Sequence, residues 1–341
     1  MKVGILTFHK AHNYGAVLQC YGLQETLKGL GHDVKVLDYC PEDLRNRYKI
    51  IQFKSFRDLL VLLTTIVRKT IRYVRFKRFM SERLDIAPLS ETGIDLYVIG
   101  SDQVWNKKLT NGYRDVCFGN FGTYAKVISY GASAETSYLG RLDKAYFEYR
   151  LRNFDKISVR EKHLVKLLQP LTDQKIYHVL DPTLLAGRGL FDNISVKPKI
   201  KDKYVLVYQV RADKKVLKIA KDIAQQTGAR VIQLSSRVSP RYIKGKHQCA
   251  SPEQFIGWIE NASCVVTTSY HGVCFSVMFK RPFYAVKLGD NETRIESLLD
   301  ILCIKDRFIQ NNIEFKDIDY VKVNQKLRRL RSTSFEYLNF V

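Results

Sequence analysis

Residues 3–39 read VGILTFHKAHNYGAVLQCYGLQETLKGLGHDVKVLDY, and this stretch decides the fold. An apolar run over residues 1–7 predicts a strand, and apolar positions at helical spacing predict a helix over residues 13–29. Gly31 then turns the chain into a second apolar run at residues 33–39, which predicts another strand. A strand, a helix and a strand in this order form a βαβ unit with parallel strands.

The same alternation continues along the chain. It predicts strands at residues 96–100, 126–133, 157–161, 178–182, 204–210, 230–234, 264–268 and 283–287, and helices at residues 214–227, at residues 253–260 and from Val273. Charged, proline-containing residues 197–203 predict a linker between two halves. We therefore expect an α/β fold with two doubly wound domains that face each other. The expected domains are residues 1–196, residues 203–310 and a C-terminal tail at residues 311–341, which can pack back on the first domain.

The composition limits the class of protein. The 341 residues carry 56 Lys and Arg against 34 Asp and Glu, a formal net charge of +22, and 45% of them are hydrophobic. This composition is typical of a globular chain, and no apolar run is long enough to predict a membrane span. The seven cysteines form no CxxC pair, which favours reduced thiols in a cytoplasmic enzyme.

Nearly half of the excess charge lies in one segment. Residues 45–83 contain twelve Lys or Arg and two acidic residues, and Leu63, Val67, Ile71 and Val74 recur there at helical spacing. Two interpretations stay open: a helix that packs on its own sheet with a solvated basic face, or a helix that lies on an anionic membrane surface. Nucleic-acid binding is disfavoured, because no known nucleic-acid-binding motif accompanies the charge.

The loop before the first helix is a candidate binding site. Ligands of open parallel sheets bind outside the carboxyl ends of the strands, and Asn13, Tyr14 and Gly15 follow the first strand there. Backbone N–H groups at a helix start can hold a phosphate, a carboxylate or a sugar hydroxyl. The alternative is that Asn13 only caps the helix and Gly15 only allows close packing.

Two further strand ends carry candidate catalytic groups. Asp102 follows the strand at residues 96–100, beside Gln103 and Trp105, and is a candidate general base or merely a helix cap. His271 lies between Ser269, Gly272 and the next helix, where a histidine suits a general acid or a phosphate partner.

Three arginines could bind an anion. Arg211 follows the strand at residues 204–210, and Arg294 begins a helix. Arg160 comes after residues 157–159 at the end of the predicted strand, where Glu161 favours a structural role for it. A guanidinium binds carboxylate or phosphate through two parallel hydrogen bonds, although each arginine could also be a solvated surface residue. The histidines and cysteines show no metal-ligand spacing, so we expect no metal.

The stretch at residues 3–39 and four later motifs together resemble the polysaccharide pyruvyl transferase family. The motifs are IGSDQVWN at residues 99–106, ISVREK at residues 157–162, VLDPTLL at residues 179–185 and TTSYHGVCFSVMFKRPFYAV at residues 267–286. The resemblance extends from about Lys2 to about Ile304. It implies two Rossmann-like domains around a cleft, as in GT-B glycosyltransferases, with the acceptor on the first domain and the donor on the second.

The resemblance also implies an activity. The family transfers the pyruvyl group of phosphoenolpyruvate to two sugar hydroxyls as a ketal and releases phosphate, with no other cofactor. The family's histidine falls on His271, and Ser269 stands where many members have a donor-binding arginine. Arg211 and Arg294 are then the expected donor anchors, with Ser269 and Gly272 beside them.

On the acceptor side we expect Asn13, Tyr14, Gly15, Gln103 and Trp105 to contact a sugar or a lipid-linked oligosaccharide. The expected location is the cytoplasm, with peripheral contact to the inner face of the cell membrane if residues 45–83 bind lipid. Two other functions stay open: a GT-B glycosyltransferase with a nucleotide-sugar donor, and a non-catalytic carbohydrate- or membrane-binding protein.

Overall fold

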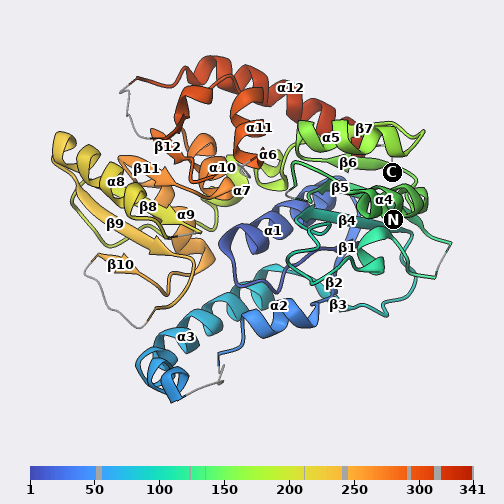
Figure 1. The fold of residues 1–341 in the computed structure, drawn as a ribbon, viewed down its shortest axis with the longest axis horizontal. Coiled ribbons are helices and arrows are strands. Elements are labelled where there is room, and N and C mark those ends of the chain that lie inside the picture. Colours follow the sequence, from blue (N-terminus) through green and yellow to red (C-terminus); the bar gives the residue numbers. More distant parts are fainter. Residues whose placement is uncertain are drawn as a thin grey trace.

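The computed structural model describes residues 1–50, 56–122, 124–134, 136–210, 212–239, 245–289, 293–310 and 316–339. It contains two parallel β-sheets, each connected through helices (Figure 1). The expected α/β fold, with two Rossmann-like doubly wound domains, is confirmed.

The N-terminal sheet has seven strands among the described residues, in the order β3-β2-β1-β4-β5-β6-β7. The strands are β1 (Lys2–Leu6), β2 (Asp33–Asp38), β3 (Ile86–Pro88), β4 (Leu96–Asp102), β5 (Lys126–Ala132), β6 (Ile157–Val159) and β7 (Ile176–His178). The helices of this half are α1 (Tyr14–Gly29), α2 (Glu42–Arg47), α3 (Phe56–Arg83), α4 (Arg141–Arg150), α5 (Lys162–Leu168), α6 (Pro182–Ala186) and α7 (Arg188–Asp192).

The C-terminal sheet has six strands among the described residues, in the order β10-β9-β8-β11-β12-β13. The strands are β8 (Tyr204–Gln209), β9 (Arg230–Ser235), β10 (Lys246–His247), β11 (Cys264–Thr267), β12 (Phe283–Val286) and β13 (Phe308–Ile309). The helices of this half are α8 (Lys214–Thr227), α9 (Pro252–Glu260), α10 (Tyr270–Met278) and α11 (Thr293–Ile301), and α12 (Tyr320–Leu338) ends the described chain.

Two elements differ from the sequence prediction because a side chain caps a helix. The strand predicted at residues 178–182 ends at His178, since Asp181 Oδ1 accepts a hydrogen bond from Thr183 N at 2.9 Å and begins α6. The helix predicted from Val273 begins at Tyr270, since Ser269 Oγ accepts from Gly272 N at 3.3 Å.

The last helix returns to the N-terminal domain (Figure 1). Tyr337 Oη donates to the carbonyl of Ser129 on β5 at 2.7 Å, and Leu180 N donates to Ser334 Oγ at 2.9 Å. These contacts are buried, so α12 is part of the first domain's core although it follows the second domain in sequence.

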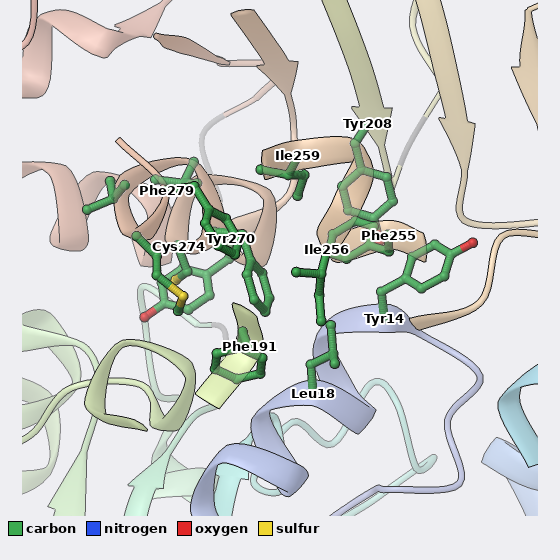
Figure 2. Close-up of a cluster of buried hydrophobic side chains, with 14 of the residues drawn as sticks. Tyr14, Leu18, Phe191, Tyr208, Phe255, Ile256, Ile259, Tyr270, Cys274 and Phe279 are labelled. Carbon is green, nitrogen blue, oxygen red and sulfur yellow. The ribbon is translucent and has the colours of Figure 1, made fainter. Parts of the chain in front are cut away.

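A continuous apolar core joins the two domains. Helix α1 contributes Tyr14 and Leu18 to it, and α9 contributes Phe255 and Ile256 from the other domain (Figure 2). The rings of Tyr14 and Phe255 stack with centroids 4.5 Å apart and an interplanar angle of 9°. The domains are therefore held together by buried side chains and not by a surface contact alone.

Helix α3 also binds both domains, through two arginines. Arg72 donates to Tyr14 Oη at 2.8 Å and to the carbonyl of His12 at 3.0 Å in the first domain. Arg75 donates to the carbonyl of Cys249 at 2.7 Å in the second domain. Part of the basic segment thus makes interdomain contacts.

The face of α3 that carries the predicted apolar positions points to solvent. Leu63, Val67, Ile71 and Val74 are 66%, 67%, 40% and 54% exposed. The buried face is formed instead by residues such as Phe76, Phe79 and Met80. Helix α3 therefore packs on the protein as the first interpretation expects, but through these residues and not through the predicted stripe. Within the described chain, no helix has both the length and the hydropathy required to span a bilayer.

The two faces predict unequal effects on stability for two substitutions in α3. Phe79→Ala should lower the free energy of unfolding by about 3–5 kcal/mol, because it leaves a cavity in the interdomain core. Val67→Ala should change it by less than about 0.5 kcal/mol, because the side chain is exposed. Urea unfolding followed by circular dichroism measures both values. Equal losses for the two variants would contradict this assignment of faces.

Candidate active site

A buried arginine joins the ends of two strands in the N-terminal sheet. Arg160 follows β6, and its Nη2 donates to Asp102 Oδ1 at the end of β4 at 2.7 Å. Its Nη1 donates to Asp181 Oδ2, beyond β7, also at 2.7 Å. The guanidinium also contacts Glu161 Oε1 at 3.3 Å, so three carboxylates share one cation.

The cations decide the protonation of two of these carboxylates. Burial alone would raise the pKa of Asp102, but Arg160, His271 and Arg294 outweigh it, and the pKa is lowered. Burial likewise opposes ionisation of Asp181, yet His271 and Arg160 hold its pKa well below the usual range. Glu161 differs, because burial outweighs Arg160 and raises its pKa. Asp102 and Asp181 are therefore both ionised near neutral pH.

His271 brings the second domain to this cluster. It lies in the first turn of α10, just beyond β11, and its Nε2 is 3.5 Å from Asp181 Oδ2. The other edge of its imidazole faces the start of α1: a Cβ on Gly15 would lie 2.0 Å from Nδ1. Only glycine at position 15 leaves room for the ring. His271 therefore has a carboxylate on one side of its imidazole and the N-terminus of α1 on the other.

Arg294 adds a second cation from the C-terminal domain. Its Nη1 is 4.0 Å from Asp102 Oδ1, and its guanidinium carbon is 5.8 Å from the ring centroid of Tyr270. Arg160 lies 4.6 Å from the same ring centroid. The cluster thus has two cations, two ionised carboxylates and an imidazole, which suit proton transfer next to an anionic substrate.

The other predicted donor residues have structural contacts of their own. Ser269 caps α10, and a Cβ on Gly272 would lie 2.4 Å from Thr267 Oγ1, so Gly272 allows α10 to pack on its preceding strand. Their donor roles stay predictions. Arg211 lies outside the described residues.

The predicted acceptor residues divide into two groups. Asn13 and Gly15 lie at the site, where Asn13 Oδ1 caps α1 by accepting from Gly15 N at 2.9 Å. Tyr14 lies in the interdomain core, Gln103 accepts from Asn106 Nδ2 at 2.7 Å, and Trp105 donates to the carbonyl of Cys117 at 2.8 Å. Acceptor binding by all five stays a prediction, and burial leaves the side chains of Tyr14 and Trp105 no surface to offer a sugar.

Sequence reasoning missed Asp181, and it kept Arg160 as a possible anion-binding residue for which Glu161 favoured a structural role. The signal for Asp181 is its position before Pro182, since Asp followed by Pro is typical of a helix start. No local signal links Asp181 to His271, because their contact joins the two domains. Within the described residues no group of three or more His, Cys, Asp or Glu could hold a metal ion. That the protein needs neither a metal nor a cofactor stays a prediction.

The sequence profile of the polysaccharide pyruvyl transferase family matches residues 13–290. No protein with a curated description matches the chain.

Solved structures of nucleotide-sugar enzymes resemble the chain distantly. UDP-GlcNAc 2-epimerase from Methanocaldococcus jannaschii is 12% identical, with a TM-score of 0.49, over 96% of this chain and 92% of that one. The Neisseria meningitidis UDP-GlcNAc 2-epimerase bound to UDP-GlcNAc is 10% identical, with a TM-score of 0.48, over 98% of this chain and 100% of that one. The spinosyn forosaminyltransferase SpnP is 11% identical, with a TM-score of 0.40, over 98% of this chain and 95% of that one. At these values the likeness says nothing about donor or reaction.

The contact between His271 and Gly15 predicts a specific effect of one methyl group. Gly15→Ala should displace the imidazole, shift the ring resonances of His271 in NMR spectra and lower the melting temperature. Gly29→Ala in the same helix is the matched control, because a Cβ there meets nothing within 4 Å. The control should leave the His271 resonances unchanged. Unchanged resonances in Gly15→Ala would contradict the contact.

Proposed function

The chain belongs to the polysaccharide pyruvyl transferase family, and on this basis we propose that it transfers the pyruvyl group of phosphoenolpyruvate to two hydroxyls of a sugar as a ketal. The reaction would serve polysaccharide or glycan biosynthesis. The observation that carries the proposal is the position of His271, the family's histidine, beside a buried carboxylate at the junction of the two domains.

The reaction needs one proton donor and two hydroxyl deprotonations. A proton adds to the methylene carbon C3 of phosphoenolpyruvate, and the oxygen of the first hydroxyl bonds to C2 as its own proton leaves. The second hydroxyl then displaces phosphate from C2. One hydroxyl proton replaces the proton taken up at C3, and the other leaves with the phosphate, so the products are the ketal and inorganic phosphate.

His271 is the proposed acid for C3, because its Nε2 lies 3.5 Å from Asp181 Oδ2, a buried carboxylate that can orient the ring. A group in this role contributes about 10²–10⁴ in rate. Asp102 is the proposed base for the hydroxyls. Since Arg160 and Arg294 keep its pKa low, it accepts a proton only as the new C–O bond makes the hydroxyl acidic.

Arg294 and Arg211 are the proposed anchors for the phosphate and carboxylate of the donor. Arg294 supports this role because it lies beside Asp102 and its guanidinium is partly exposed, so an anion can reach it. On the acceptor side, Asn13 and Gly15 are the proposed contacts for a sugar, because Gly15 packs against the imidazole of His271 and Asn13 caps the same helix start.

We further propose that helix α3 rests on an anionic membrane from the cytoplasmic side. Its exposed stripe of Leu63, Val67, Ile71 and Val74 continues at its C-terminal end into exposed Lys77 and Arg78. An apolar face next to basic side chains is suited to the headgroup region of a bilayer, where each basic residue adds about 1 kcal/mol.

The proposed acid predicts a large kinetic effect of one substitution. His271→Gln should lower the rate of phosphate release from phosphoenolpyruvate, with a sugar acceptor present, by about 10²–10⁴. His247→Gln is the matched control, because that histidine is exposed on β10. A wild-type rate of phosphate release in His271→Gln would show that His271 is not the acid of the reaction.

The donor itself is tested by thermal shift. Phosphoenolpyruvate should raise the melting temperature, whereas stabilisation by nucleotide-sugars alone would favour a glycosyltransferase. No turnover with any donor, together with salt-sensitive binding to anionic vesicles that persists in His271→Ala, would favour a non-catalytic binding protein.

The proposed membrane contact is tested by sedimentation with vesicles. The wild-type protein should sediment with phosphatidylserine-containing vesicles and not with neutral ones. The double variant Leu63→Gln, Val67→Gln should lose most of this binding, whereas Val321→Gln, on an exposed position of α12, should keep it. Equal binding by the double variant would contradict the proposal. A wild-type dimer that the double variant abolishes would show instead that a second copy covers the stripe.

A further inference from the structure

A cationic cavity of about 330 Å³ lies between the domains, beside α3. It is bounded by the loop before α1, the chain after α2, one face of α3 and the chain after β9. Five of the eleven residues that line it are basic, and none is acidic: Arg47, Lys49, Lys69, Arg72 and Arg237. The mechanism proposed above uses none of them.

Arg72 is a buried cation of this cavity whose hydrogen bonds go to neutral oxygens. Its side chain is buried, with 6% of the residue exposed, and its guanidinium donates to the neutral oxygens of Tyr14, His12 and Gln248. No carboxylate among the described side chains lies within 4.0 Å of it. A buried cation without a counter-ion is costly, and an anion in the cavity would supply the missing charge.

The cavity adjoins the candidate active site. His12 lines the cavity, and Asn13 and Gly15, at the start of the helix that follows it, lie at the candidate site. Tyr48 also lines the cavity, and burial raises the pKa of its phenol. The charges of Arg47, Arg237 and Arg72 lower this pKa, whereas the charge of Asp102 raises it further. The Tyr48 phenol is therefore within electrostatic reach of the cavity's cations and of the catalytic cluster.

Aromatic rings form one wall of the cavity. The imidazole of His12 lies 5.7 Å from the ring centroid of Tyr48 and 5.1 Å from that of Tyr73. Burial and the charge of Arg72 lower the pKa of His12 to about 4, so this ring is neutral at pH 7. The lining thus combines fixed cations with apolar ring surface, as sites for phosphate esters of organic groups do.

We propose that this cavity binds a phosphate or diphosphate ester. Two substrates of the proposed reaction could supply the ester: phosphoenolpyruvate, or an acceptor glycan that is attached to its carrier through a phosphate or diphosphate. The proposal of an anion-binding site depends only on the lining of the cavity. The identity of the ester depends in addition on the proposed function. If the ester belongs to the acceptor, the cavity selects carrier-bound glycans over free sugars.

The binding site is tested by calorimetric titration with inorganic pyrophosphate, which needs no turnover. Lys69→Ala and Arg237→Ala should each weaken pyrophosphate binding by about tenfold, because one charge-assisted hydrogen bond is worth roughly that factor. Lys221→Ala, which removes an equal charge from an exposed position on α8, should bind like the wild-type protein. Circular dichroism and melting temperature check that each variant folds.

A parallel titration with phosphoenolpyruvate identifies the ester. An equal loss of phosphoenolpyruvate binding in both cavity variants assigns the cavity to the donor, whereas unchanged phosphoenolpyruvate binding assigns it to the acceptor. Absence of pyrophosphate binding by the wild-type protein, wild-type binding by both cavity variants, or an equal loss in Lys221→Ala would each overturn the proposal. Failure of the proposed function is a separate result: no phosphate release from phosphoenolpyruvate, whatever pyrophosphate binding shows.

Discussion

The packing of α1 against α9 fixes the distance between the two domains, and the candidate site depends on that distance. Tyr14 stacks on Phe255 in the interdomain core. Gly15, the next residue, presents its backbone to the imidazole of His271. One turn of helix therefore holds the domains together and forms a wall of the site. This explains why a tyrosine with no access to solvent stands beside a glycine that touches a candidate catalytic group.

The charge of +22 has several separate locations in the folded chain. Arg160 is fully paired with carboxylates, and Arg75 donates to backbone and side-chain oxygens of the second domain. Arg72 belongs to a cavity whose lining contains no carboxylate. The cluster at the candidate active site thus alternates cations and anions and suits proton transfer, whereas the lining of the neighbouring cavity carries one sign of charge and suits binding an anion.

The sequence predicts those features that depend on local periodicity. The βαβ unit, the two parallel sheets and helix α8 at residues 214–227 follow from apolar spacing and from turn residues. The contact between His271 and Asp181 could not be predicted, because it joins residues of different domains. Helix α3 shows a second limit: periodicity shows that Leu63 and Val67 share a face, but not whether that face meets protein or solvent. The buried Trp105 shows a third, since a polar strand end does not tell which of its side chains turn inward.

The interdomain core also constrains how the enzyme moves. A hinge motion that separated the two sheets would expose the rings of Tyr14, Tyr208 and Phe255 to water (Figure 2). Each Å² of apolar surface so exposed costs about 25 cal/mol, and aromatic rings bury large areas. Wide opening of the domains is therefore disfavoured at every stage of turnover. In the proposed reaction, substrates would therefore enter, and phosphate would leave, through rearrangement of the surface loops around the candidate site.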